Sequence, residues 1–169
     1  ALNLQGTVTG TLGATATTGG ITDSAELNVS SAATFTSAMG TNVILDTAAN
    51  TVGSTVSFVA SAGTLANVTI VDDSALDLQG LTIGGNLVAT GLDLTQSGAL
   101  VVATGTSMLT STGVGNDIVL TNNSNDFATV IVSSGTGAVT LVDADDIDLG
   151  ASSVGGTLSV TTTSGAITD

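Results

Sequence analysis

The stretch VTIVDDSALDLQG (residues 68–80) recurs downstream as VTLVDADDIDLGA (residues 139–151), and this recurrence decides the fold. Both stretches begin with alternating apolar and polar residues, pass through an acidic turn and end in a second short run, LDL or IDL. Alternation with a period of two is typical of strands that have one buried face. The chain therefore repeats a unit of strand, acidic turn and strand.

The repeat extends beyond this stretch. TDSAELNV (residues 22–29) matches TQSGALVV (residues 95–102), and GGNLVAT (residues 84–90) matches GGTLSVT (residues 155–161). Two copies of about 73 residues thus occupy residues 22–94 and 95–167, and residues 1–21 resemble the tail of a preceding copy. We expect the sequence to start and stop inside an array of such copies.

The composition favours β-structure along the whole chain. The hydrophobic fraction is 42% but only 2% of residues are aromatic, so the core must consist of Val, Ile, Leu and Ala. Val, Ile and Thr suit a pleated surface, and with 22 Gly and no Pro the turns must use Gly, Asn, Asp and Ser. Strands of three to five residues are too short for independent hairpins but suit stacked coils of about 18 to 25 residues.

We therefore predict an all-β fold, a parallel β-helix (β-solenoid) of stacked coils that runs as one domain over residues 1–169. An antiparallel sandwich of similar short strands is the structural alternative, although a sandwich does not need a long repeat. The chain has no cysteine, so backbone ladders and packing must supply its stability. Neither a signal peptide nor an apolar run long enough to span a membrane is expected.

The charge balance excludes several classes of partner. The chain has 14 acidic residues and no Lys, Arg or His, which gives a formal net charge of −14. Nucleic acids and anionic membranes are therefore repelled. Without His, Lys, Arg, Cys or Tyr, only carboxylates and hydroxyls remain for catalysis, and we expect no enzyme. A carboxylate pair as in glycoside hydrolysis is the catalytic alternative, but the three Phe residues and the absence of cations leave little to hold a sugar.

Two segments carry a family resemblance. NDIVLTNNSNDFATVIVSSGTGAVTLVDADDIDLG (residues 116–150) and GGTLSVTTTSGAITD (residues 155–169) resemble the repeats of filamentous-haemagglutinin-type exoproteins, and the whole chain has this texture. The resemblance implies a right-handed parallel β-helix in a very large secreted bacterial protein, exported by two-partner secretion or autotransport. It also implies a role as an adhesin or surface fibre, with host or environmental surfaces as partners.

The acidic turns are the candidate metal site. Five residues occupy equivalent turns of the two copies: Asp72, Asp73, Asp143, Asp145 and Asp146. Carboxylate and carbonyl oxygens are the ligands that calcium prefers, and stacked copies could bring these turns onto one face. The alternative role is structural, because Asp caps backbone groups in turns. No other cofactor is expected.

Other polar residues have structural interpretations. Asn50 and Asn125 occupy the same repeat position, and inward Asn side chains in solenoid turns form hydrogen-bonded ladders along the stack. Asp77 and Asp148 each lie between two apolar residues, so strand alternation points them outward.

Three functions fit these features. The first is a rigid, non-enzymatic stalk or fibre of a secreted surface protein, with neighbouring repeats as its partners. The second is a subunit that stacks end to end with copies of itself into an extracellular filament or sheath, because open coil ends invite pairing. The third is a calcium-dependent module that binds glycans on its acidic surface.

Overall fold

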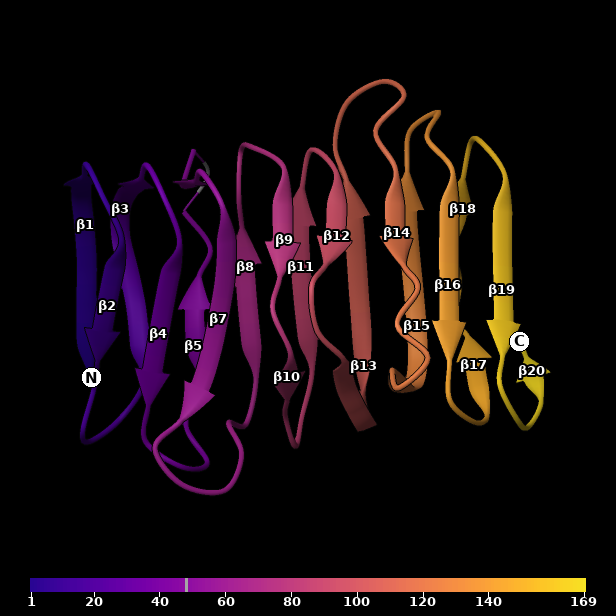
Figure 1. Ribbon diagram of the computed structural model, residues 1–169, viewed down its shortest axis with the longest axis horizontal. Coiled ribbons are helices and arrows are strands. Elements are labelled where there is room, and N and C mark those ends of the chain that lie inside the picture. Colours follow the sequence, from indigo (N-terminus) through magenta and orange to yellow (C-terminus); the bar gives the residue numbers. More distant parts are fainter. Residues whose placement is uncertain (48) are drawn as a thin grey trace.

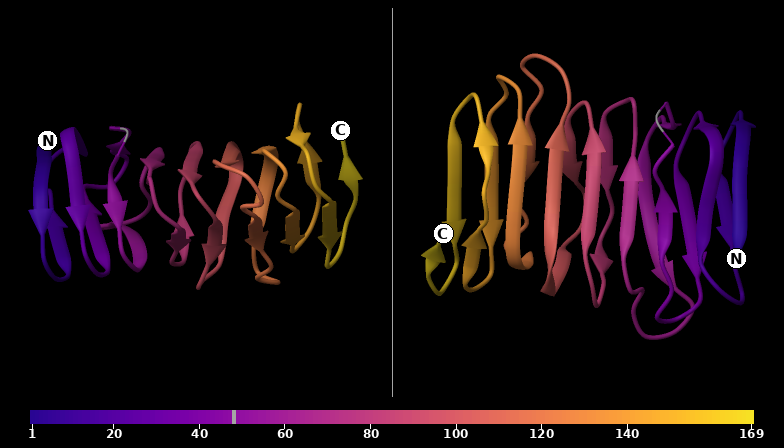
Figure 2. Two further views of the ribbon diagram at one scale, coloured as in Figure 1. Left: turned by 90° about the horizontal axis from the view of Figure 1, so that it is seen from above. Right: turned by 180° about the vertical axis from the view of Figure 1, so that it is seen from behind.

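The computed structural model describes residues 1–47 and 49–169, and over these residues the chain is built from β-strands without a helix. Nothing in this part of the chain is therefore a helix that could cross a membrane. The strands form two sheets that lie face to face along a flattened rod, with the termini at opposite ends (Figures 1 and 2).

The first sheet, sheet A, contains twelve strands within the described residues. They are β1 (Leu2–Val8), β3 (Ile21–Val29), β5 (Val43–Leu45), β6 (Thr51–Val52), β8 (Val68–Val71), β10 (Leu81–Thr82), β11 (Leu87–Gly91), β13 (Leu100–Ser111), β15 (Asp126–Ser134), β17 (Ile147–Leu149), β18 (Ser153–Val154) and β20 (Ile167–Thr168).

The opposite sheet, sheet B, contains eight strands within the same residues. They are β2 (Leu12–Thr15), β4 (Ala33–Ser37), β7 (Thr55–Ala60), β9 (Leu76–Leu78), β12 (Leu94–Gln96), β14 (Ile118–Leu120), β16 (Val139–Asp143) and β19 (Leu158–Thr162).

The chain alternates between the two sheets and so winds as a β-solenoid of about eight coils. All strand pairs described are parallel, which confirms the predicted solenoid and contradicts the antiparallel sandwich. Leu76 pairs with Leu94, and Val43 pairs with Val68, so one coil takes between 18 and 25 residues. This span lies within the predicted range.

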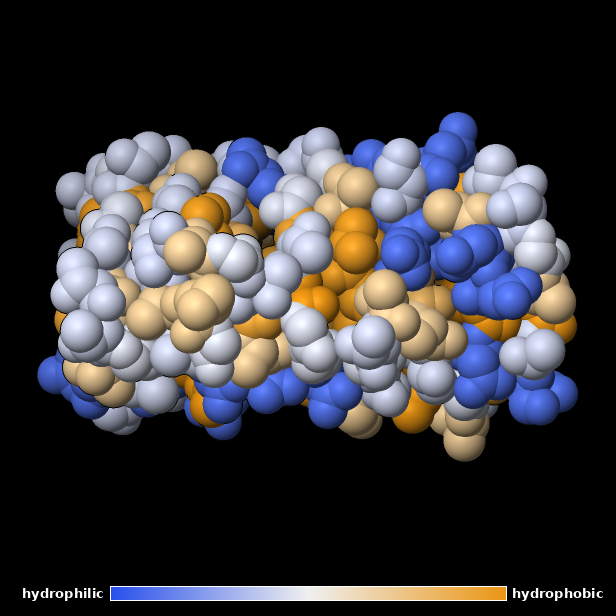
Figure 3. Space-filling model, turned by 90° about the horizontal axis from the view of Figure 1, so that it is seen from below, coloured by the Kyte–Doolittle hydropathy of each residue, from blue (hydrophilic) through white to orange (hydrophobic). Residues whose placement is uncertain are grey.

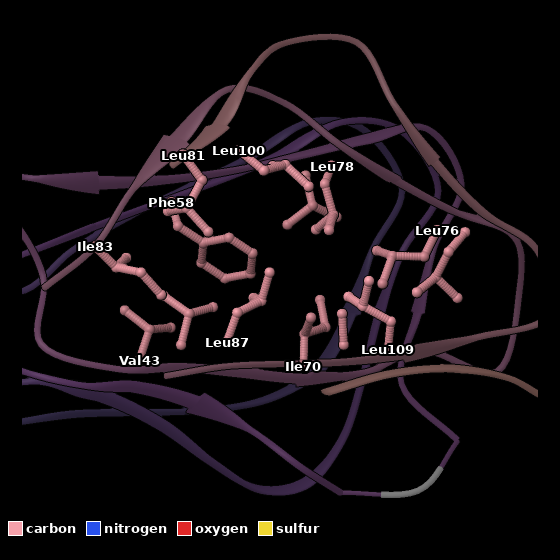
Figure 4. Packing of buried hydrophobic residues seen from close by; sticks show 14 of the residues in the cluster. Val43, Phe58, Ile70, Leu76, Leu78, Leu81, Ile83, Leu87, Leu100 and Leu109 are labelled. Carbon is pink, nitrogen blue, oxygen red and sulfur yellow. The ribbon is translucent and has the colours of Figure 1, made fainter. Parts of the chain in front are cut away.

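The core fills the space between the sheets from one end of the stack to the other. Residues in alternate positions of each strand point inward, as in β8, where Val68 and Ile70 are buried and their neighbours are half-exposed. Leu, Val and Ile from successive coils pack on each other in continuous rows (Figure 4). Phe35 and Phe58 stack across neighbouring coils with their ring centroids 5.6 Å apart.

Tight stacking also explains why glycine occupies certain turns. A Cβ atom on Gly137 would lie 1.7 Å from the carbonyl oxygen of Asn116 in the neighbouring coil. No side chain fits at that distance, so only glycine lets the two turns approach. Gly13, in contrast, has no atom within 4 Å of the position that a Cβ would take, and is not required for the same reason.

The two copies of the sequence repeat are offset by half a coil. On sheet A, Ile21 pairs with Val43, Val43 pairs with Val68 and Val68 pairs with Leu87, which makes three coils. Leu94 then begins β12 on sheet B. One period of the repeat, from Ile21 to Leu94, is therefore three and a half coils. Equivalent residues of the two copies consequently lie on opposite sheets, as Val68 in β8 and Val139 in β16 do.

Candidate functional site

The acidic turns are built around two buried carboxylates, Asp72 and Asp143. Asp72 directly follows β8; its Oδ2 accepts the N–H of Val52 at 3.0 Å and its Oδ1 accepts the N–H of Ser74 at 2.8 Å. The carboxylate thus caps a backbone group of the preceding coil and closes its own turn.

Asp143, the last residue of β16, repeats this arrangement. Its Oδ2 accepts the N–H of Phe127 at 2.8 Å and its Oδ1 accepts the N–H of Asp145 at 3.1 Å. The two turns lie at opposite edges of the rod, because β8 points to the upper edge and β16 to the lower edge in Figure 1. The possibility that stacked copies bring these turns onto one face is therefore not realised, since the repeat advances by a half-integral number of coils.

The other candidate metal ligands are less buried. Asp73, Asp145 and Asp146 lie at the surface, and Oδ1 of Asp146 accepts the N–H of Ala166 in the next coil at 2.6 Å. Over the described residues, no three acidic side chains are placed to hold one metal ion. The carboxylates of Asp72 and Asp143 are buried and already accept hydrogen bonds from backbone N–H groups, so their oxygens serve the turns themselves.

Asn50 and Asn125 are both buried and both join three consecutive coils. The Oδ1 of Asn50 accepts the N–H of Leu27 at 2.8 Å, and its own carbonyl accepts the N–H of Asp73 at 2.7 Å. Each Asn is therefore a link between neighbouring coils. The two residues belong to separate stacks of such links, because they too lie half a coil out of phase.

Asn125 makes the fuller set of bonds. Its Oδ1 accepts the N–H of Leu100 at 2.9 Å, and its Nδ2 donates to the carbonyl of Val142 at 3.0 Å and to Oε1 of Gln96 at 2.9 Å. Its backbone carbonyl accepts the N–H of Ala144 at 2.7 Å. Side chain and backbone together satisfy polar groups that the turn would otherwise bury without partners.

The two outward-facing aspartates differ in their surroundings. Asp77 and Asp148 are both half-exposed at outward positions of β9 and β17. Oδ1 of Asp148 accepts the hydroxyl of Thr168 at 3.2 Å, whereas Oδ1 of Asp77 is shielded from water without a hydrogen-bond partner among the described residues.

Burial raises the pKa of three carboxyl groups near these turns. Desolvation is the main cause at Asp72, Asp126 and Asp143, and the negative charges of neighbouring aspartates add to it. At Asp72 and Asp143, hydrogen bonds from backbone N–H groups oppose the rise in pKa without cancelling it. Asp126, Asp143 and Asp145 come from adjacent coils at the lower edge, where hydrophilic residues gather towards the C-terminal half (Figure 3).

These pKa values predict that mild acid stabilises the fold. The folded state holds more protons than the unfolded state between the unfolded pKa of 3.8 and the raised folded values, so the free energy of unfolding rises as the pH falls through that window. This contribution to the free energy of unfolding is lost as the pH rises through the pKa values of the folded state. Urea denaturation followed by circular dichroism should give a higher midpoint at the acidic end of the window than at pH 7.

Two variants separate this effect from the general repulsion among the 14 acidic residues. Asp143→Asn should flatten the dependence of the urea midpoint on pH, because it removes a buried titrating group, whereas Asp46→Asn should leave it unchanged, because Asp46 is exposed and its charge does not contribute to the raised pKa of Asp72, Asp126 or Asp143. Equal slopes in the two variants would show that the buried carboxyl is not the source.

The comparison with protein families covers nearly the whole chain. A family described as repeats of unknown function (DUF5649) matches residues 1–59, 65–134 and 136–169. The chain belongs to this family. No curated protein and no solved structure matches it.

This DUF5649 chain contains a further ladder that the sequence analysis missed. Oδ1 of Asn42 accepts the N–H of Asn67 at 3.2 Å, Oδ1 of Asn67 accepts the N–H of Asn86 at 2.8 Å, and Oδ1 of Asn86 accepts the N–H of Thr106 at 2.9 Å. The ladder links four coils along the lower edge of sheet A. In the sequence, each of these Asn residues directly precedes a strand: Asn42 precedes VIL, Asn67 precedes VTIV and Asn86 precedes LVAT.

The same device recurs half a coil away with aspartates. Oδ1 of Asp93 accepts the N–H of Asp117, and Oδ1 of Asp117 accepts the N–H of Ala138, both at 2.7 Å. Several carboxylates in this DUF5649 chain therefore accept hydrogen bonds from backbone N–H groups of a neighbouring coil, and these bonds take the place of ion pairs with side-chain cations. The chemistry of these turns is that of structural links between coils.

Proposed function

We propose that this chain is a rigid, non-enzymatic section of a secreted bacterial surface protein, where it forms a stalk or fibre for adhesion or for an extracellular matrix. The observation that carries the proposal is the continuity of the core. One cluster of buried apolar residues runs from Ala14 to Ile147 through successive coils. A rod with an uninterrupted core transmits load along its axis, because each coil is bonded to the next.

The polar residues support a structural role. Asp72, Asp143, Asn50 and Asn125 all use their side chains to bind backbone groups of adjacent coils. Such bonds hold the stack in register, and burial keeps these four side chains away from the surface. The resemblance of residues 116–150 and 155–169 to filamentous-haemagglutinin-type repeats supports the secreted, surface-exposed part of the proposal.

A subunit that stacks end to end is the second candidate, because another copy would cover the apolar surface of the end coils as well as a further coil of the same chain would. Leu158 and Ile167 are 42% and 47% exposed, whereas Leu94, which occupies the position equivalent to Ile167 one copy earlier, is fully buried. Open hollows of about 220 and 400 Å³ lie at the two ends, the first beside Leu2 and Thr15 and the second beside Leu149 and Leu158. Another coil placed on either end would cover this apolar surface.

Scattering and microscopy test the proposal. For the purified chain, small-angle X-ray scattering should give a stiff rod about 40 Å long, since about eight coils stack about 4.8 Å apart. Negative-stain electron microscopy of the same sample should show no filaments if the stalk is right. Continuous filaments would favour the end-to-end subunit, and a scattering curve of a flexible chain would contradict both.

A second measurement tests the cellular setting. Antibodies against the chain should label intact cells that make the protein, as a surface location requires. Labelling that appears only after the cells are permeabilised would overturn the secreted part of the proposal and leave the rigid rod unaffected.

A further inference from the structure

The chain has two sulfur atoms, and both lie at the surface of the rod. The sequence contains two Met and no Cys, and these two residue types are the ones that peroxides oxidise most readily. Met39 is 64% exposed and Met108 is 47% exposed. The core over the described residues consists of Ala, Val, Leu, Ile and Phe and holds no sulfur. An oxidant therefore meets both of its targets outside the core.

Met108 lies on the outer side of sheet A, in the middle of β13. Its neighbours in register are Val88 of β11 and Ile131 of β15, and the backbone of β13 pairs with both strands on either side of it. The next residue, Leu109, is fully buried, as the alternation of a strand requires. Backbone pairing and Leu109 hold the fold at this point, so oxygen added to the sulfur of Met108 breaks no contact of the core.

Met39 lies in the loop between β4 and β5, at the lower edge in Figure 1, and contacts the long loop between β7 and β8. Its Sδ lies 2.8 Å from the position that a Cβ atom on Gly63 would take, so the side chain rests on that glycine. The two loops are also joined without the sulfur, because the N–H of Gly40 donates to the carbonyl of Thr64 at 2.9 Å. A second backbone bond, 2.8 Å long, joins the same loops. Oxidation of Met39 leaves both bonds in place.

The reaction at each sulfur is the transfer of one oxygen atom. The sulfur lone pair attacks one oxygen of hydrogen peroxide, the sulfur–oxygen bond forms as the oxygen–oxygen bond breaks, and the other oxygen leaves as water after proton transfer. Sulfur loses two electrons and the peroxide gains them. The product, methionine sulfoxide, is polar and disrupts packing when it is buried in a core. At an exposed position, water solvates the same group.

We propose that Met39 and Met108 are the oxidation sites of this chain, with hydrogen peroxide and related two-electron oxidants as the co-reactants, and that the solenoid keeps its fold when both are sulfoxides. Each chain thus takes up one oxygen atom at each of its two Met residues without damage to its core. The proposal is independent of the stalk or fibre role, because it depends only on where the sulfur atoms lie.

Mass spectrometry of the folded chain after treatment with an excess of hydrogen peroxide tests the sites. The mass should rise by one oxygen atom for each of the two Met residues and then stop rising. Met39→Leu and Met108→Leu should each take up one oxygen atom, and the double variant none. Leucine keeps the volume and apolar character of methionine, so the variants should fold as the parent does. Circular dichroism should give the same urea midpoint before and after oxidation of the parent.

A matched control moves the sulfur by one residue. Met108→Leu combined with Leu109→Met transfers it along β13 from the outer side of the sheet into the core. Oxidation at position 109 should be at least tenfold slower than at Met108 in the parent, and the urea midpoint should fall once it has occurred. If circular dichroism shows that this variant does not fold, Leu78→Met, at a fully buried position of β9, takes its place.

Three results would overturn the proposal. Uptake of fewer than two oxygen atoms by the parent would show that one of the two sulfur atoms is covered. A lower urea midpoint for the oxidised parent would show that the fold depends on the thioethers. Equal oxidation rates at the outer and the buried position would show that burial in the core does not protect a sulfur atom in this chain.

Discussion

Replacement of Asn125 by alanine is expected to lower the free energy of unfolding by about 3 to 5 kcal/mol, because it strips several buried groups of their partners at once. The N–H of Leu100 and the carbonyl of Val142 both lose a hydrogen bond, and the amide of Gln96 loses two. A buried polar group without a hydrogen-bond partner costs about 1 to 3 kcal/mol. Because Asn125 is fully buried, water cannot readily take over the hydrogen bonds that its side chain makes.

Asn123→Ala is the matched control. Asn123 lies in the same turn but is exposed, so its truncation should change stability by no more than about 0.5 kcal/mol. Urea denaturation followed by far-UV circular dichroism gives the comparison, since the chain has no Trp or Tyr for fluorescence. If the two variants unfolded at the same urea concentration, the bonds of Asn125 would contribute nothing net.

Phe127→Ala is expected to cost about 3 to 5 kcal/mol through a cavity in the core. Phe127 is fully buried in β15, beside Val102 of the neighbouring coil. Few large side chains are present to collapse into the space, because only 2% of the chain is aromatic. Val114→Ala, at a position 87% exposed, is the control and should leave the free energy of unfolding nearly unchanged.

The location of the damage is a second readout for Phe127→Ala. Coils contact only their neighbours, so the loss should spread from the coils of β13, β15 and β17 and leave β1 to β4 more protected. Hydrogen exchange followed by mass spectrometry resolves this difference. Uniform loss of protection along the whole chain would show that the solenoid unfolds as a single cooperative unit.

The fold class was predictable from the sequence because its signals are local. Alternation in runs such as VTIV gives inward and outward positions that the structure confirms at Val68 and Ile70. The long repeat and the short strands together predicted stacked coils, and the parallel register bears this out. Asp77 and Asp148 also occupy the outward positions that strand alternation indicated.

The arrangement of the polar residues was less predictable because it depends on non-local register. Asp72 and Asp143 were recognised as turn residues, but their carboxylates bind the backbone N–H groups of Val52 and Phe127, 20 and 16 residues away. The period of about 73 residues was clear, while the coil length was known only within a range. From the sequence, a repeat period of three and a half coils therefore could not be distinguished from a period of three or four whole coils.

The half-coil offset between copies has a mechanical consequence. If an array of these copies continues the same winding, each copy is related to the next by a half-turn about the rod axis, which is a two-fold screw operation. Sheets A and B differ in composition, so a single copy is expected to bend towards one side. The next copy bends towards the opposite side, and the curvature cancels over two periods, or seven coils and about 34 Å. A chain of unequal faces can in this way build a straight shaft.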